Sequence, residues 1–186
     1  IEARASGFYR VHKTFSSAPV YHVSLNDSKV QRFRGTLSYH SFNPPAYIGF
    51  LAEMDQLDPH DEIQTRWAVG LANAPLLLTW ASTRYVLHRE FTGPPAPDTI
   101  RWEDYGYVPQ ALFDDVRVLE NRFFLPFGFT SEAWLPYAEF HRLDYPRKEA
   151  ALFAAAVLAD PPETCVAGLN RVRADALRPI GNSADL

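Results

Sequence analysis

Proline is the residue that most constrains how this chain can fold. Fifteen prolines are spread over 186 residues, against only 9 glycines. Proline fixes φ and donates no backbone hydrogen bond, so it ends helices and is excluded from the interior of a sheet. The sequence therefore predicts short helices and strands joined by irregular connections. Large side chains hold them rigid, since aromatic residues make up 14% of the chain.

The length and the apolar content fit one globular domain. A chain of 186 residues buries about 70% of its unfolded surface on folding, and 47% hydrophobic residues are normal for a globular protein. We expect an α/β fold of the α+β type, a mixed β-sheet with several short helices packed on it. The expected domain covers residues 1–178, and residues 179–186 form a flexible C-terminal end.

Charge and composition exclude several classes of protein. The net charge is −4, so the chain lacks the basic character of nucleic-acid-binding proteins. Cys165 is the only cysteine, which excludes an intrachain disulfide and indicates a small inert side chain. No apolar run reaches the roughly 20 residues that span a bilayer. The chain begins without Met or a signal-peptide pattern, so we expect an excised domain.

Alternation and apolar runs predict the strands. Residues 8–13 and 21–25 alternate large apolar with polar side chains, which is typical of a half-buried strand. Residues 83–88 predict a buried strand. Two further runs, 107–113 and 116–121, lie on either side of an Asp-Asp pair and predict a β-hairpin.

Prolines mark the starts and ends of the predicted helices. Helices are expected over 46–56, from Asp58 as N-cap with Pro59 in the first turn, over 75–81, and over 147–158 between Pro146 and the Pro161-Pro162 stop. Residues 131–143 are expected to form broken helical turns, residues 26–28 a turn, and residues 93–97 an exposed stiff loop.

A metal site is the first kind of chemistry to weigh. The run from Glu53 to Glu62 is rich in carboxylates and contains His60, a set of ligands that could hold a divalent cation. It lacks the regular alternate ligands and the glycine of a calcium loop. Helix capping by Asp58 and Asp61 explains the acids without a metal. We predict no metal and no cofactor.

Hydrolytic motifs are incomplete. Ser38 and His40 supply a hydroxyl and a base, but side chains so close in sequence do not meet on a strand, and no Gly-x-Ser-x-Gly elbow is present. Adjacent carboxylates such as Glu103 and Asp104 cannot flank one glycosidic bond. No glycine-rich phosphate loop occurs. We therefore assign no catalytic residue.

Aromatic side chains provide the candidate ligand site. A flat ring can stack on the C–H face of a sugar while its polar edge forms hydrogen bonds. The segment 102–107, which follows the proline-rich loop, is the best exposed candidate. The alternative is that most of these rings belong to the core. The candidate ligand-binding residues are Trp102, Tyr105, Tyr107 and Trp134.

Four segments in a fixed order carry a resemblance to a known family. They are Phe8-Tyr9-Arg10-Val11; Asn26-Asp27 with Thr36-Leu37-Ser38-Tyr39-His40-Ser41-Phe42-Asn43; Thr83-Arg84-Tyr85-Val86-Leu87; and Val118-Leu119-Glu120-Asn121 with Leu125-Pro126-Phe127-Gly128-Phe129. With a helix after Lys148, they extend from Phe8 to about Leu158. In these segments the chain resembles the large extracytoplasmic domain of the YfhO family of bacterial membrane proteins.

The resemblance implies a non-catalytic part of a larger protein. That family consists of polytopic membrane proteins similar to lipid-linked-sugar glycosyltransferases, which use a polyprenyl-phosphate sugar donor. The catalytic acid is expected in a loop between membrane helices, which this sequence does not contain. The implied domain lies on the extracytoplasmic face of the bacterial cell membrane, packs over its own transmembrane region, and positions or recognises a cell-envelope glycan acceptor or a lipid-linked sugar.

Two interpretations from different classes follow. The first is this non-catalytic domain of a membrane glycosyltransferase. In it, Glu120 and Asn121 are structural and tie the end of a strand to the turn at Pro126 and Gly128. The second is a free-standing small-ligand or carbohydrate-binding protein, or a hydrolase, with an aromatic cleft.

Overall fold

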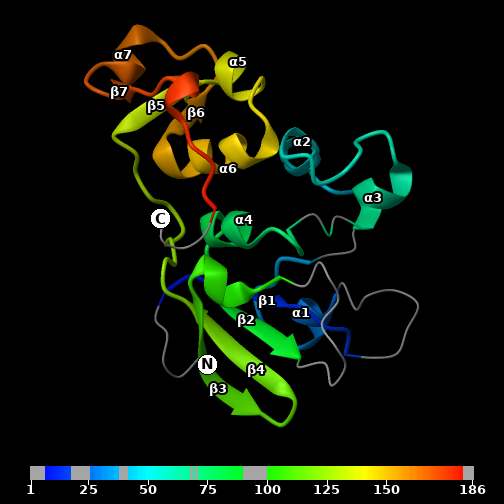
Figure 1. The fold of residues 1–186 in the computed structure, drawn as a ribbon. Helices are drawn as coiled ribbons and strands as arrows, with labels where there is room; N and C mark the ends of the chain where they lie inside the picture. The colour runs from blue at the N-terminus through cyan, green and yellow to red at the C-terminus, as the bar shows by residue number, and fades with distance from the viewer. Residues whose placement is uncertain are drawn as a thin grey trace.

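Short helices and strands build an α+β fold with a mixed sheet, as the sequence predicts (Figure 1). The computed structural model describes residues 7–17, 26–37, 42–67, 69, 71–89 and 100–181. The predicted strand 21–25 and the predicted loop 93–97 lie outside these residues. Within them, no helix is long and apolar enough to cross a membrane.

Sheet A has four strands in the order β1-β2-β4-β3. β1 runs parallel to β2, and the β3–β4 hairpin adds antiparallel neighbours. The hairpin has the predicted bounds because its turn is local: Asp114, at φ +56°, reverses the chain between two apolar runs. The strands of sheet A are β1 (Arg10–Lys13), β2 (Thr83–Arg89), β3 (Tyr107–Phe113) and β4 (Val116–Asn121).

Sheet B is a small parallel sheet that the sequence did not predict. β5 (Ala133–Pro136) lies between β6 (Ala156–Leu158) and β7 (Asn170–Arg171). The expected helical turns over 131–143 are therefore wrong in their first half, which is β5; α5 (Tyr137–Phe140) follows. The helix expected to reach Leu158 ends at Ala154, because Val157 pairs with Leu135 of β5 and this pairing overrides local helix propensity.

Among the remaining helices, two begin at their predicted proline and one has a different N-cap residue from the one expected. α2 (Pro45–Glu53) and α4 (Pro75–Trp80) each begin at their proline, as predicted. α3 (Glu62–Trp67) begins later than expected, because Asp61 and not Asp58 accepts the backbone N–H groups of the first turn. The expected turn at residues 26–28 continues into α1 (Asp27–Val30). The longest helix of the described residues is α6 (Tyr145–Ala154), and the shorter elements are η2 (Trp102–Tyr105), α7 (Glu163–Val166) and η3 (Ala174–Ala176).

One main core joins the two sheets. Alternation along the strands sends Val86 and Leu119 into it, where α4 packs against β2 and α6 lies beyond α4, against sheet B (Figure 1). Leu135 of sheet B and Leu177, which follows η3, belong to the same core. A smaller cluster covers the opposite face of sheet A: Tyr9, Val11, Tyr85 and Val118, with Phe33 and Phe124 packed against them.

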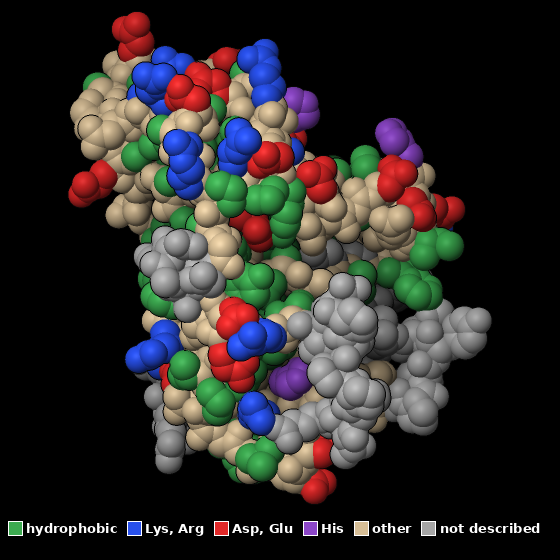
Figure 2. All heavy atoms as spheres, viewed as in Figure 1, with side chains coloured by type: hydrophobic (Ala, Val, Ile, Leu, Met, Phe, Trp, Pro, Cys, Tyr) green, Lys and Arg blue, Asp and Glu red, His purple; other side chains and the backbone are tan. Residues whose placement is uncertain are grey.

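The surface carries mixed charge. On the face shown in Figure 2, Lys and Arg side chains lie interspersed with Asp and Glu and form no patch of one sign. Most ion pairs of the described chain join exposed groups, such as Arg66 with Glu62 and Arg173 with Asp175. Such pairs contribute little to stability. The two best-shielded pairs, Lys13–Asp27 and Lys148–Glu53, therefore stand out.

Candidate ligand-binding pocket

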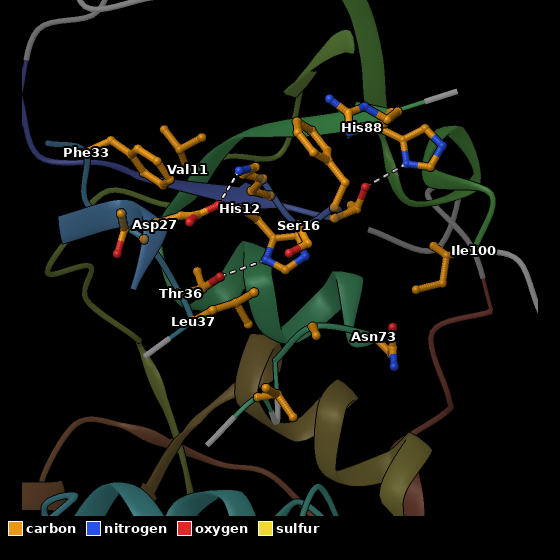
Figure 3. Close-up of a pocket in the computed structure, with 18 of the residues that line it drawn as sticks. Val11, His12, Ser16, Asp27, Phe33, Thr36, Leu37, Asn73, His88 and Ile100 are labelled. Atoms are coloured by element: carbon orange, nitrogen blue, oxygen red, sulfur yellow. Dashed lines mark hydrogen bonds and ion pairs between the residues drawn. The ribbon is translucent and has the colours of Figure 1, made fainter. Parts of the chain in front are cut away.

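A pocket of about 470 Å³ lies where the parallel strands β1 and β2 end (Figure 3). Parallel pairing brings the carboxyl ends of the two strands to the same edge of sheet A, which is where ligands bind in open, mostly parallel α/β sheets. Gly35 is needed here, because a Cβ atom would collide with Ser28 of α1. Six parts of the chain supply the wall residues used below: residues 11–16, α1, residues 33–37, Val69 with the turn at 71–73, the end of β2, and residues 100 and 102.

His12 forms the floor of the pocket. It follows Val11 on β1, and alternation places it on the opposite face of the strand, where its side chain is 1% exposed. His12 Nδ1 lies 2.7 Å from Thr36 Oγ1 (Figure 3). Burial lowers the pKa of His12 to about 4, although a hydrogen bond with the Ala72 backbone acts in the opposite direction. The imidazole is therefore neutral at pH 7.

Lys13 and Asp27 form a shielded ion pair on one wall. Their side chains are 7% and 19% exposed. Lys13 Nζ donates to the Asp27 carboxylate and to the Ser17 hydroxyl, and Gln31 Nε2 donates to the same hydroxyl at 2.8 Å. Burial tends to raise the pKa of Asp27, but the hydrogen bonds from Lys13 and Ser17 outweigh it and hold that pKa below its usual value.

Phe15 provides an aromatic wall beside the end of β2. Two cations lie near its ring, with Lys13 Nζ 4.6 Å and Arg89 Cζ 4.3 Å from the ring centroid. Arg89 also has a carboxylate partner, because its Nε lies 2.8 Å from Asp115 Oδ2. Thr14 Oγ1 lies 3.1 Å from His88 Nδ1 on the same rim (Figure 3).

The pocket is suited to binding more than to bond cleavage. Its volume lies in the usual range for small-ligand sites, about 300–1,000 Å³, and apolar walls surround a few polar groups. The Thr36–His12 contact has the distance of a nucleophile–base pair. A base with a pKa of about 4 nevertheless draws a proton from a hydroxyl weakly. Among the described residues, no group of three or more His, Cys, Asp or Glu could hold a metal ion.

The expected exposure of residues 102–107 is wrong for its two end residues. Trp102 is 4% exposed and Tyr107 is 0% exposed. Gly106, at φ +81°, turns the chain from η2 into β3, so Tyr107 faces the main core and its hydroxyl donates to the Pro75 carbonyl at 3.2 Å. The two rings meet edge to face at 5.3 Å. Trp102 also borders the pocket, beside the ring of His12.

The structure does not bring the four predicted aromatic residues into one site. Tyr105 is half-buried and packs against the main core. Trp134 lies in β5 of sheet B, where Arg171 Cζ is 5.7 Å from its ring centroid. Only Trp102 borders the pocket. The Ser38–His40 pair lies outside the described residues.

Asn121 is 3% exposed and joins β4 to its neighbours. Its Nδ2 donates to Thr79 Oγ1 at 2.8 Å and to the Thr83 carbonyl at 3.2 Å. Its Oδ1 accepts from the Phe123 N–H at 2.9 Å. These bonds connect the strand end to α4, to β2 and to the start of the following turn.

Glu120 points to the opposite face of β4 from Asn121. It pairs with Arg84 at 3.0 Å and accepts from the Tyr85 hydroxyl at 3.3 Å. Pro126 and Gly128 follow in the irregular segment before β5, and Gly128 has φ +80°. The hydrogen bonds and ion pair of Glu120 and Asn121 run to β2, to α4 and to Phe123, and not to Pro126 or Gly128.

Sequence reasoning missed the residues that build the pocket. Alternation over residues 8–13 predicted the strand, but it assigned His12 and Lys13 only to polar positions and did not predict their burial. Their burial depends on Thr36, Ala72 and Asp27, which come from distant parts of the chain. The available signal in the sequence was the adjacent pair of titratable residues, His12 and Lys13, within a predicted strand.

Comparison with known proteins adds no relative. No protein-family model matches this chain, and no curated protein or solved structure was found to match it.

Proposed function

We propose that this chain is a non-catalytic binding domain whose pocket holds a ligand of the size of one or two sugar rings. The observation that carries this proposal is the pocket itself, about 470 Å³ in volume, in which a neutral His12 and the Phe15 ring lie beside hydroxyl and amide groups. Aromatic faces and hydrogen-bonding edges together are what sugar recognition uses.

The ligand in this proposal is a cell-envelope glycan acceptor or a lipid-linked sugar, and the domain belongs to a membrane protein similar to polyprenyl-phosphate-sugar glycosyltransferases. Supporting it, three of the four segments that resemble the YfhO family include residues of the adjacent strands β1, β2 and β4. The resemblance thus involves the centre of sheet A and the strands that carry the pocket. A detergent-dependent, much larger native product would support this context, and a soluble product of about this size would contradict it.

A free-standing small-ligand-binding protein is the second candidate. It is favoured by one observation: the described residues alone supply aromatic, aliphatic and polar walls to the pocket. Both candidates share the pocket and differ only in the protein that contains it.

Titration with a panel of neutral mono- and disaccharides tests the shared claim. We expect saturable binding by calorimetry or ligand-observed NMR, and its loss in Phe15→Ala, which removes the aromatic wall. The matched control is Phe113→Ala at the tip of the hairpin, where the ring is 66% exposed; it should bind as the wild type does. Absence of binding by the wild type, or equal binding by both variants, would contradict the proposal.

A further inference from the structure

The charges that face the pocket cancel in pairs. Among the described wall residues, the formally charged side chains are Lys13, Asp27 and Arg89, and the titratable ones also include His12 and His88. Lys13 is matched by Asp27, Arg89 is matched by Asp115, and His12 is neutral at pH 7.

The Lys13–Asp27 pair decides the charge of the pocket, because it is the more shielded of the two. Asp27 is 19% exposed, whereas Asp115 is 51% exposed and largely screened by solvent. Lys13 has two oxygen partners already, Asp27 and Ser17. An anionic ligand entering this pocket would lose its hydration, and among the described wall residues it would find no cation without a carboxylate partner.

We propose that Asp27 is a specificity-determining residue, which neutralises Lys13 and makes the pocket select uncharged ligands over anionic ones. The inference rests on the proposed function, since it concerns the ligand of the same pocket. Sugar hydroxyls can exchange hydrogen bonds with its polar groups without separating the ion pair. Carboxylate and phosphate groups would have to compete with Asp27 for Lys13.

Asp27→Asn tests this inference, because it keeps the shape of the side chain and removes its charge. The wild type should bind a neutral hexose at least about tenfold more tightly than the corresponding hexuronic acid. In Asp27→Asn, Lys13 becomes an uncompensated cation, so the acid should gain at least about tenfold, and the gain should shrink as salt is added. The matched control is Asp104→Asn on η2, an exposed acid outside the pocket wall, which should leave the preference unchanged.

Inorganic phosphate separates failure of this inference from failure of the proposed function. If the wild type binds no sugar, the proposed function fails, but phosphate binding still tests whether Asp27 neutralises Lys13. Phosphate binding by Asp27→Asn but not by the wild type supports it, and equal phosphate binding by both overturns it. Wild-type preference for the hexuronic acid also overturns it.

A second variant guards against a misfolded Asp27→Asn. Lys13→Met removes the cation, so anions should remain excluded and the neutral hexose should still bind. If the wild type binds phosphate and Lys13→Met loses that binding, Lys13 is an open anion site and the inference is wrong. Thermal melting of each variant identifies any that fails to fold.

Discussion

Acidification should destabilise this protein through His12. The side chain is 1% exposed, and burial lowers its pKa from 6.5 to about 4. Between these two values the unfolded chain binds a proton that the folded chain does not, so stability is fully present above pH 6.5 and is lost as the pH falls towards 4. The difference of about 2.5 pH units, at 1.36 kcal/mol each, gives about 3 kcal/mol.

Other groups titrate nearby, so the experiment compares two proteins. Burial raises the pKa of Glu149, which contributes with the opposite sign, and the lowered pKa values of Glu53 and Asp27 act only at or below the ordinary carboxylate range. His12→Gln removes the imidazole and leaves these groups in place. Urea unfolding of the wild type and of His12→Gln should be measured from pH 7 to pH 4, with circular dichroism at pH 7 to confirm that both fold.

The free energy of unfolding of the wild type should fall by about 3 kcal/mol more than that of His12→Gln over this range. NMR of the imidazole should give the same value, with protonation near pH 4 in the folded protein. Identical pH profiles for the two proteins would refute the reasoning. So would an imidazole that titrates near 6.5 in the folded state.

Three further substitutions test the packing around the two sheets, each by urea or thermal unfolding. Asn121→Ala should destabilise by about 1–3 kcal/mol, because Thr79 and the Thr83 carbonyl lose a buried partner; Asn170→Ala, on exposed β7, should change stability by less than about 0.5 kcal/mol. Lys148→Met should cost about 1–3 kcal/mol, since Glu53 loses a shielded partner and keeps only Tyr137 and His141. Exposed Lys29→Met should be near neutral. Gly106→Ala should cost more than about 2 kcal/mol, because φ is +81° and the new Cβ would meet Phe123. Gly168→Ala, at φ +85° with open space around the glycine, should cost only the backbone strain of a left-handed φ. An unchanged melting curve for Asn121→Ala, or equal losses within the lysine pair or the glycine pair, would contradict these assignments.

Interactions between neighbouring residues explain which helices and strands could be predicted from the sequence. The β3–β4 hairpin needs only a turn at Asp114 between two apolar runs, and α4 needs only Pro75 followed by three leucines. Both were predicted, because the residues that determine them are neighbours in the chain.

Contacts between distant parts of the chain explain which features could not be predicted from the sequence. Val157 continues an alanine-rich helical pattern, yet its strand is set by Leu135, more than twenty positions earlier. The same holds for the pocket, where Thr36 meets His12 from another part of the chain. Trp102 and Tyr107 carry polar edges that suit either a core or a ligand site, and only the turn at Gly106 decides between them.

The parallel pairing of β1 with β2 also determines the order in which this protein can fold. The β3–β4 hairpin closes through a short turn, and β2 reaches β4 across the longer stretch between Arg89 and Val116. The pairing of Arg10 with Thr83 spans a still longer part of the chain. Loop-closure entropy delays such non-local pairing. The pocket, which lies at the end of β1, is therefore among the last features to form. A partly folded chain would expose β2 as an open sheet edge, and a partner or a chaperone could occupy it during this interval.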